Sequence, residues 1–532
     1  MLAGFYPDPA ICKAGDDYYL VTSTFAWYPG LPVLHSKDLV NWNTIGHVLD
    51  RPSQLNLDGA GVSRGLFAPS IQYHLETFYV VCTNVDNGEN FVVTAKDPKG
   101  SWSEPTWLPQ VHGFDPSLFF DSGKAFIVFN SDPPENKSLY EGHRSIRMFA
   151  FDPVTLKTTG EEIILVDGGV DISKQPIWIE APHLYRVGEY YYLMCAEGGT
   201  GYDHSEVIFR SRNVKGPFVP GPRNPILTQR HLDPQRENPI TTTGHADLVE
   251  VRPGEWWAVF LGCRPYSRAD EDLYNTGRET FLAPVKWLDG WPVINPDHME
   301  VQYHYPYPLP QKKETHDLPL SGNFTWRDDF DSGNLALHWI FLRTVREQWF
   351  GISDNHLELK VRPETCSEKR NPSLVGHRQQ HIHSKATTSL RFQPLTEHEK
   401  AGLVVFQNEH AFLYICKSSS AGKPVIQFFK SPVNDSQPME LLAEHALNGD
   451  DDNPVLIRIE SKGGAYSFSY APDDDKWQTL ADHVDGTFLS TKRAGGFVGC
   501  VFGLYATSLG KPSLNHAFYD WFEYAGKDPS LD

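Results

Sequence analysis

Five aromatic runs recur along the first part of this chain: DDYYLVTST (16–24), TFYVVCTN (77–84), KAFIVFNS (124–131), EYYYLMCAE (189–197) and EWWAVFLG (255–262). Each run is rich in aromatic and β-branched residues, which is the composition of a β-strand. The runs return at intervals of roughly 47 to 66 residues, and a recurrence of this length indicates a repeat architecture. The sequence therefore predicts five copies of one β-rich unit.

A second short run precedes each aromatic run by about ten residues. These runs are PDPAIC (7–12), APSIQY (68–73), DPSLFF (115–120), APHLYR (181–186) and HADLVE (245–250). Each pair of runs is typical of two antiparallel strands joined by a tight polar turn. A sheet of about four strands cannot cover its own apolar faces and must stack on its neighbours, so five such sheets predict a five-bladed β-propeller. A β-sandwich would explain the strands but not the repeat.

The repeat also predicts a site, because the first strand of each blade lines the axis of a propeller. The residues three positions before the repeated aliphatic residue of each blade are Asp8, Ala68, Asp115, Ala181 and His245, and Glu180 lies one residue further back. Three carboxylates and an imidazole are therefore expected at one end of the axis. A single Asp-Pro pair could simply open a turn in solvent. Equivalent positions in several blades favour a site, because grouped carboxylates repel one another.

Paired carboxyl groups are what glycoside hydrolysis requires, one as a proton donor to the leaving oxygen and one as a base for water. A third carboxylate raises the pKa of the donor and keeps it protonated near neutral pH. The sequence contains no HExxH, P-loop or Rossmann glycine motif that would favour another chemistry. His245 is either a hydrogen-bonded axial residue or a neighbour of an ion in the propeller channel.

Along nearly its whole length the sequence resembles glycoside hydrolase family 43, the β-xylosidase and α-L-arabinofuranosidase family. The motifs that carry the resemblance are GFYPDPAIC (4–12), STFAWYPG (23–30), SKDLVNW (36–42), GFDPSLF (113–119), EAPHLY (180–185), AEGGTGYDHS (196–205), GHADLVE (244–250) and TGRET (276–280). The resemblance implies an inverting, exo-acting enzyme with Asp8 as general base, Glu180 as general acid and Asp115 as the residue that tunes and orients the acid. It further implies that Arg278 lies near the acid and the sugar hydroxyls. The implied substrate-binding residues are Arg278, His245, Phe25, Trp27, Phe67 and Phe114.

Two departures from the family pattern bear on the substrate. The segment GAGVSRGLFAP (59–69) has Phe67 where xylosidases often have tryptophan, and NSDPPENKSLYEGHR (130–144) differs from the plain xylosidase pattern. A reshaped wall and a longer rim favour a branched ligand, so we expect an α-L-arabinofuranosidase acting on arabinoxylan or its oligosaccharides. A β-1,4-xylosidase, or an enzyme with both activities, is the alternative. A non-catalytic carbohydrate-binding propeller and a retaining fructoside-cleaving propeller are more remote readings.

A second domain is predicted where the repeat stops. The segment YPYPLPQKKETHDLPL (305–320) precedes a new series of short alternating strands that opens at WRDDFDSGNLALHWIFLR (326–343). We predict a catalytic propeller over residues 1–305, a linker over 306–324 and a jelly-roll-like β-sandwich over 325–532. The sandwich is expected to pack on the propeller and close one side of the pocket, or to be an independent sugar-binding module.

Composition narrows the choice of partners and environment. The net charge of −20 on 532 residues disfavours binding to nucleic acid or to anionic membranes. Seven scattered cysteines form no CxxC pair and are expected to be mostly buried, small apolar residues. No cofactor is expected to be required, although a structural Ca²⁺ ion is compatible with the channel. Three glycosylation sequons favour a secreted protein that has lost its leader, with a cytoplasmic protein as the alternative.

Overall fold

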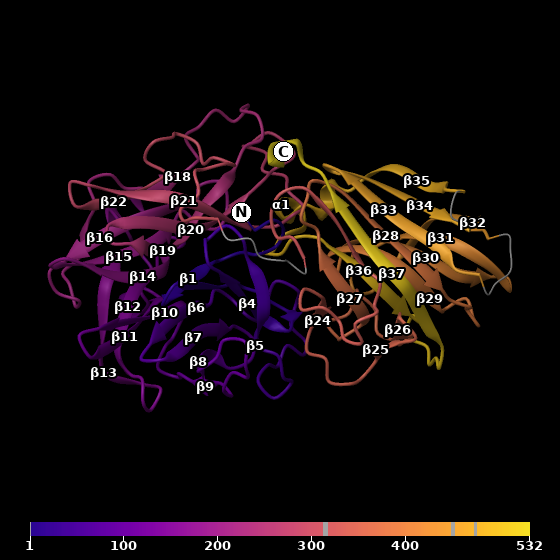
Figure 1. The fold of residues 1–532 in the computed structure, drawn as a ribbon, viewed down its shortest axis with the longest axis horizontal. Coiled ribbons are helices and arrows are strands. Elements are labelled where there is room, and N and C mark those ends of the chain that lie inside the picture. The colour runs from indigo at the N-terminus through magenta and orange to yellow at the C-terminus, as the bar shows by residue number, and fades with distance from the viewer. Residues whose placement is uncertain (1, 312–317, 448–452, 473–475) are drawn as a thin grey trace.

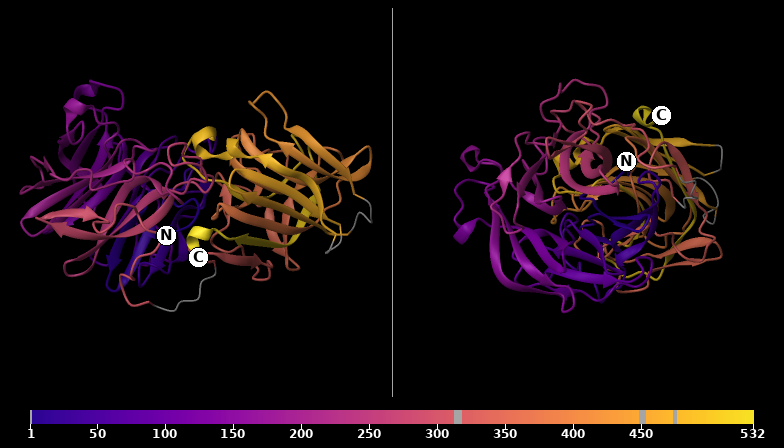
Figure 2. Two further views of the ribbon diagram at one scale, coloured as in Figure 1. Left: turned by 90° about the horizontal axis from the view of Figure 1, so that it is seen from above. Right: turned by 60° about the vertical axis from the view of Figure 1, so that its left-hand side comes forward.

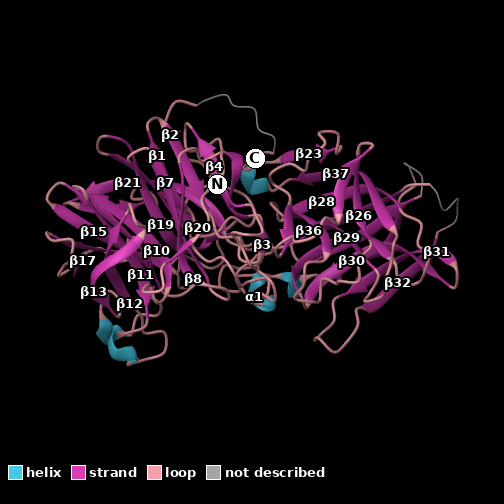
Figure 3. Ribbon diagram, turned by 90° about the horizontal axis from the view of Figure 1, so that it is seen from below, coloured by secondary structure: helices cyan, strands magenta, loops and turns pink. Residues whose placement is uncertain are grey.

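The computed structural model describes residues 2–311, 318–447, 453–472 and 476–532. Two β-rich bodies lie side by side, the first coloured indigo to magenta and the second orange to yellow (Figures 1 and 2). Within the described ranges the helices are single short turns (Figure 3). These are η1 (Pro134–Asn136), η2 (Ile172–Lys174), η3 (Thr487–Leu489), α1 (Thr491–Ala494) and η4 (Pro529–Leu531). None of the described helices has the length and apolar character needed to cross a membrane.

The first body consists of five antiparallel sheets, one for each predicted repeat. From inner to outer strand, the first blade contains β1 (Ala10–Ala14), β2 (Asp17–Val21), β4 (Gly30–Ser36) and β5 (Asn43–Leu49), and the second contains β6 (Ser70–His74), β7 (Thr77–Asn84), β8 (Glu89–Ala95) and β9 (Thr106–Trp107). The third contains β10 (Phe114–Asp121), β11 (Lys124–Ser131), β12 (Ser145–Asp152) and β13 (Lys157–Asp167), and the fourth contains β14 (Glu180–Val187), β15 (Tyr190–Glu197), β16 (Ser205–Ser211) and β17 (Val219–Pro220), with β18 (Leu227–Thr228) also on β16. The fifth contains β19 (Thr241–Arg252), β20 (Glu255–Cys263), β21 (Glu279–Leu288) and β22 (Trp291–Ile294). The five-bladed propeller is confirmed.

The head of the inner strand has an unusual backbone in four of the five blades. Asp8, Asp115, Ala181 and His245 have φ values between 50° and 55°, in the left-handed region that non-glycine residues rarely adopt. The ladders of β10, β14 and β19 shift register at the same level. A bulge of this kind bends a strand and turns a side chain out of the regular alternation. It therefore lets residues of successive blades face the axis together.

The amino-terminal segment closes the ring by pairing with the last blade. The amide of Leu2 donates to the carbonyl of Thr280 at 2.7 Å, and the Thr280 hydroxyl donates to the carbonyl of Tyr6 at 2.6 Å. Leu2 and Tyr6 also pack in an apolar cluster shared by the first and fifth blades. Residues at the two ends of the propeller sequence are thus held next to each other, which places Asp8 beside the fifth blade.

The second body is a sandwich of two eight-stranded antiparallel sheets. One sheet contains β25 (Phe350–Ser353), β26 (His356–Lys360), β37 (His516–Gly526), β28 (His383–Arg391), β33 (Val455–Lys462), β34 (Ala465–Ala471) and β35 (Gln478–Asp485), with β23 (Phe324–Asp328) on β37. The other contains β3 (Trp27–Tyr28), β24 (Ile340–Leu342), β27 (Ser373–Arg378), β36 (Val501–Thr507), β29 (Lys400–Asn408), β30 (Ala411–Ser420), β31 (Lys423–Lys430) and β32 (Glu440–Ala446). The predicted sandwich is confirmed, and residues 312–317 of the predicted linker lie outside the described residues.

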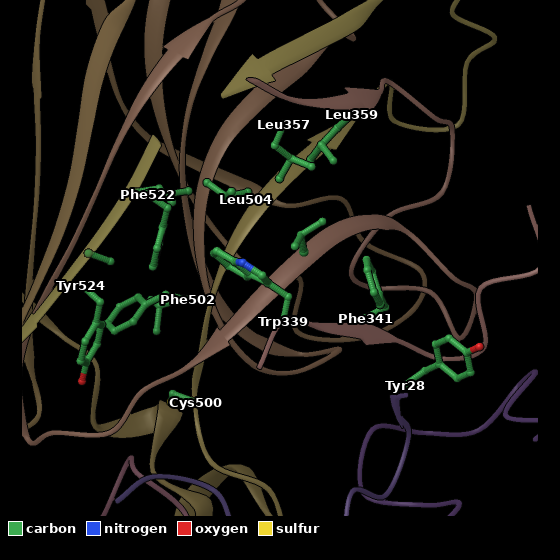
Figure 4. Close-up of a cluster of buried hydrophobic side chains, with 14 of the residues drawn as sticks. Tyr28, Trp339, Phe341, Leu357, Leu359, Cys500, Phe502, Leu504, Phe522 and Tyr524 are labelled. Carbon is green, nitrogen blue, oxygen red and sulfur yellow. The ribbon is translucent and has the colours of Figure 1, made fainter. Parts of the chain in front are cut away.

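The two bodies are joined by main-chain pairing and by buried charge. Strand β3, from the propeller sequence, pairs with β24 of the sandwich, and Tyr28 lies next to Phe341 at the edge of the sandwich core (Figure 4). Arg264 of the propeller is fully buried and donates to Glu279 of its own blade and, at 2.6 Å, to Asp528 near the carboxyl terminus. Because a buried charge needs its partners, these bonds fix how the two bodies sit against each other.

The seven cysteines are all buried, in line with the expectation that most of them would be, and all are unpaired. Burial raises the pKa of each thiol for which a shift is resolved, Cys12 and Cys82 among them. A buried thiol with a raised pKa is a poor nucleophile. The cysteines therefore pack as small apolar side chains.

Candidate active site

A cavity of about 460 Å³ opens where the heads of the inner strands meet. Its lining includes the three carboxylates and the imidazole that the repeat selected, together with aromatic side chains. The lining residues are Asp8, Phe25, Arg64, Phe67, Ala68, Phe114, Asp115, Trp178, Glu180, Gly199, Thr200, His245, Arg278 and Phe497. The structure thus brings residues from every blade of the propeller, and one from the sandwich, to one site.

Asp8 is held by two donors at the base of this cavity. Nη1 of Arg278 lies 2.8 Å from Oδ1 of Asp8, and the hydroxyl of Ser23 donates to Oδ2 at 2.5 Å. Asp8 and Arg278 are 4% exposed each, so the guanidinium compensates an ionised carboxylate that solvent barely reaches. Arg278 lies close enough to Glu180 for its charge to lower the pKa of that residue, in line with the position that the resemblance implied, and it also contacts the expected base directly. A carboxylate fixed in this way is suited to accept a proton.

Glu180 and Asp115 form a second, proton-retaining part of the site. Burial, followed by the negative charge of Asp8, raises the pKa of Glu180 to about 7. Burial, followed by the charge of Glu180, raises the pKa of Asp115 well above its usual range, and the amide of Ala181 donates to Asp115 at 3.3 Å. Because two neighbouring carboxylates cannot both ionise easily, the pair keeps a proton near neutral pH. The pair can therefore act as a general acid, that is, as a proton donor.

His245 lies beside Asp8 as a neutral imidazole. Its Nδ1 is 3.9 Å from Oδ1 of Asp8, and burial lowers its pKa to about 3. His204 lies nearby, with Nδ1 bonded to the carbonyl of Thr242 at 3.0 Å and its pKa lowered to about 4 by burial. His204 belongs to the motif AEGGTGYDHS, but sequence reasoning gave it no role.

The donors around His245 do not fit a calcium ion. Calcium takes six to eight oxygen ligands, whereas the groups here are imidazoles and the carboxylate of Asp8, which Arg278 already binds. In the part of the chain that the structure describes, no cluster of three or more His, Cys, Asp or Glu side chains is arranged to hold a metal.

The walls of the cavity are aromatic, and three of the four predicted aromatic residues belong to them. Phe25, Phe67 and Phe114 line the cavity, and Phe67 packs edge-on against the other two at 5.5 and 6.1 Å between ring centroids. Phe497 of the sandwich stacks on Phe25 at 5.6 Å and completes the wall. The sandwich therefore closes one side of the pocket, which was one of the two roles expected for it.

Trp27 was wrongly assigned to substrate binding. Its side chain is fully buried in a cluster between the two bodies and packs edge-on against Phe406 of the sandwich. The physical reason is a turn, because the amide of Trp27 bonds the carbonyl of Thr24 and Phe25 has φ of 50°. This turn directs Phe25 into the cavity and Trp27 away from it, so their spacing of two residues does not place them on one face.

Two rim residues, Trp178 and Arg144, were missed by sequence reasoning. Trp178 lines the cavity, and the guanidinium of Arg144 lies 5.1 Å from the ring centroids of both Trp178 and Phe114. The positive charge of Arg144 also lowers the pKa of Glu180. Arg144 is the last residue of the segment 130–144, which differs from the plain xylosidase pattern. This difference is the only feature of the sequence that could have pointed to Arg144. Trp178 lies two residues before Glu180 and carried no repeat signal.

The arrangement matches the requirements of glycosidic bond hydrolysis. A carboxylate on the first blade and a carboxyl pair from the third and fourth blades, which retains a proton, line one cavity with aromatic walls. A carboxylate bound by a guanidinium and a carboxyl group that keeps its proton near neutral pH can act together as base and acid. The fold and the site define a glycosidase.

Comparisons with known proteins specify the family. The model of glycosyl hydrolases family 43 matches residues 1–292, and that of the β-xylosidase C-terminal concanavalin A-like domain matches residues 327–525. The chain belongs to glycoside hydrolase family 43. A curated xylosidase/arabinosidase of Butyrivibrio fibrisolvens is 38% identical, with 98% of each chain covered. A non-reducing end α-L-arabinofuranosidase of Bacteroides ovatus is 37% identical, covering 98% of this chain and 94% of the relative.

Solved structures agree with these relatives over both bodies. A GH43_12 protein retrieved from a capybara gut metagenome superposes with a TM-score of 0.88 at 40% identity, covering 95% of this chain and 94% of that one. A Bacteroides ovatus xyloglucan GH43B protein superposes with a TM-score of 0.85 at 36% identity and 99% coverage of both chains. The propeller and the sandwich together are thus a shared architecture.

Proposed function

We propose that this glycosidase is exo-acting and inverting, and that it releases terminal α-L-arabinofuranosyl residues from arabinoxylan or its oligosaccharides. The observation that carries the proposal is the single cavity in which Asp8, paired with Arg278, faces the proton-retaining pair Asp115 and Glu180. A cavity of about 460 Å³ is at the small end of ligand pockets. This size suits the end of a sugar chain better than a long stretch of polymer.

The proposed mechanism assigns one proton transfer to each side of the cavity. Asp8 accepts a proton from a water molecule as that water attacks the anomeric carbon, and Arg278 holds the Asp8 side chain in place. Glu180 donates its proton to the glycosidic oxygen as the bond breaks, so the leaving sugar departs as a neutral alcohol and not as an alkoxide. Asp115 keeps the acid protonated and orients it. No cofactor takes part in these steps.

The arabinofuranoside preference is supported by the shape of the wall and by two relatives. Phe67 stands where xylosidases of the family often have tryptophan, and it forms part of the cavity wall. The relatives at 38% and 37% identity are named for arabinosidase activity, the first of them together with xylosidase activity. Relatives at 33% and 31% are named as a putative β-xylosidase and a β-xylosidase, and they support β-xyloside cleavage as the second candidate activity.

The test is a direct comparison of an aryl α-L-arabinofuranoside with the matching aryl β-D-xyloside. We expect kcat/KM to be higher for the arabinofuranoside, with free arabinose also released from arabinoxylan. A higher kcat/KM for the xyloside would assign the protein to β-xylosidases. Absence of hydrolysis of both compounds and of arabinoxylan would remove the catalytic proposal and favour a carbohydrate-binding propeller.

A further inference from the structure

One buried carboxylate in the propeller, that of Asp247, lies between the inner strands of the two blades that supply the expected base and acid. Asp247 is on β19, two residues after His245, and is 1% exposed. The fifth blade, to which β19 belongs, lies between the fourth blade and the first, because the amino-terminal segment closes the ring against it. Strand β19 therefore has β14, which begins at Glu180, on one side and β1, which follows Asp8, on the other.

The carboxylate of Asp247 binds the main chain of the first blade. The amide of Ile11, on β1, donates to Oδ2 of Asp247 at 2.9 Å. Ile11 is three residues after Asp8, so this bond lies at most about 10 Å along the chain from the expected base, at roughly 3.3 Å per residue. Both partners are buried, and 236 positions separate them in the sequence. The bond therefore fixes the position of β1 relative to β19.

The other oxygen of the same carboxylate binds the fourth blade. The hydroxyl of Tyr185, on β14, donates to Oδ1 of Asp247 at 2.6 Å and accepts the amide of Leu248 at 2.9 Å. Nδ1 of His183, also on β14, lies 3.6 Å from the same oxygen. Burial, followed by the negative charge of Asp247, raises the pKa of Tyr185 well above its usual range, so the hydroxyl keeps the proton that it donates. Asp247 thus holds β14 on the strand that begins at Glu180.

A second buried carboxylate fixes the backbone of β19 directly before Asp247. Glu206, on β16 of the fourth blade, is fully buried, and its Oε2 accepts the amide of Ala246 at 2.9 Å. Ala246 lies between Asp247 and His245, whose φ is 53°. The left-handed turn at His245 is therefore tied to the fourth blade. A fixed backbone lets the Asp247 carboxylate hold the strands on both sides of it.

We propose that Asp247 is a positioning residue, which sets the separation of the carboxyl groups of Asp8 and Glu180 by joining the inner strands of their blades. Inversion needs a gap between these groups that admits one water molecule, and a misplacement of about 1 Å can lower the rate about 10²-fold. The cavity lining within the described residues includes neither Asp247 nor Tyr185, so both act on catalysis through the strands. This inference rests on the proposed roles of Asp8 and Glu180 and adds the contact that spaces them.

The first test separates the fourth-blade bond from the rest. Tyr185→Phe removes the hydroxyl that binds Asp247 and keeps the ring. Because β14 is then less firmly placed, proton donation by Glu180 should weaken, and kcat on an oligosaccharide is expected to fall about tenfold while KM changes less than about twofold. An aryl glycoside of the same pentose with a leaving group of low pKa needs little protonation and should lose much less activity.

Tyr192→Phe is the matched control for this test. Tyr192 is buried on β15 and pairs with Tyr185 across the ladder. Its hydroxyl also reaches the fifth blade at 2.6 Å, but it donates to the carbonyl of Gly290 in the turn between the outer strands β21 and β22. We expect a similar fall in Tm for the two tyrosine variants, with kcat on both substrates unchanged in Tyr192→Phe.

The second test changes the carboxylate itself. Asp247→Asn keeps the shape of the side chain but replaces one acceptor oxygen with an N–H₂ donor, which weakens the hold on β1 or β14. We expect kcat on the oligosaccharide to fall about 10²-fold. If this variant does not fold, Tyr185→Phe decides alone.

The outcomes of the two tests are distinct from failure of the proposed function. Equal kcat values for Tyr185→Phe and Tyr192→Phe would overturn the proposal. A loss in Tyr185→Phe that is confined to KM, or that is equal on the two substrates, would also overturn it, because neither reflects a displaced acid. Failure of the proposed function would show in the wild type, which would hydrolyse neither substrate.

Discussion

Nη1 of Arg278 donates a 2.8 Å hydrogen bond to Oδ1 of Asp8, so a buried ion pair joins the fifth blade of the propeller to the first at the base of the cavity. The two residues are separated by 270 positions in the sequence. Their contact depends on ring closure, in which Leu2 pairs with Thr280. The expected general base is therefore set by the closure of the fold as well as by its own blade.

This ion pair predicts a stability effect. Arg278→Ala would leave Asp8 buried without its counter-charge, and we expect the free energy of unfolding at neutral pH to fall by about 3 kcal/mol. Denaturant unfolding measures the change. Adding Asp8→Asn should restore part of the loss, because the uncompensated charge is then gone. Equal losses in the single and double variants would show that packing of Arg278, rather than its charge, is responsible.

The acid role of Glu180 predicts a dependence on the leaving group. Glu180→Ala removes proton donation, so hydrolysis of a natural glycosidic bond should fall severely, by about 10²-fold or more. An aryl glycoside with a leaving group of low pKa needs little protonation and should lose much less activity. Asp8→Ala, which removes activation of water, should slow both substrates alike. Equal losses on both substrates in Glu180→Ala would transfer the acid role to Asp115.

The coupling of Asp115 to Glu180 predicts a shift in the pH–rate profile. The pKa of Glu180 is raised to about 7, so activity is expected to decline as the pH rises through that value and the acid loses its proton. Asp115→Asn leaves Glu180 as the only carboxyl of the pair, so the proton that the pair retains should be lost at lower pH, and this high-pH limb should move to lower pH while the protein remains folded. The measurement is kcat/KM as a function of pH.

Arg144 provides a control of opposite sign for the same experiment. Its positive charge lowers the pKa of Glu180, so Arg144→Met should move the high-pH limb to higher pH. An unmoved limb in Asp115→Asn would argue that Asp115 does not tune the acid. Loss of soluble protein in Asp115→Asn would assign this residue to the structure instead.

The positions of the two acting carboxyl groups predict the stereochemical outcome. Asp8 is on the first blade and Glu180 on the fourth, and both line the cavity, so we expect their carboxyl groups to be separated across it. Inversion needs a gap of about 6.5–9.5 Å between carboxyl groups, which admits a water molecule. NMR of the product during the first turnovers should show the inverted anomer. The retained anomer would exclude the water-activating role of Asp8.

The sequence alone was sufficient to predict the propeller, the sandwich and the residues at the heads of the inner strands. Strand pairing within a blade is local, so the spacing of aromatic and aliphatic runs predicts the blade, and stacking of five similar blades predicts the shared axis. The positions of Asp8, Asp115 and His245 followed from this repeat, with Glu180 one residue away from it. The structure brings all four to one cavity.

Tertiary structure decided which further residues reach that cavity. Phe497 comes from the sandwich, and Trp178 and Arg64 come from loops, so no repeat relates them to the carboxylates. Trp27 lies only two residues from Phe25 but is directed into the core between the bodies by the turn after Thr24. Periodic patterns report the face of a regular strand, whereas the direction of a loop side chain depends on the surfaces that meet around it. For this reason the grouping of the carboxylates around one axis could be predicted from the sequence, and the walls that surround them required the packed structure.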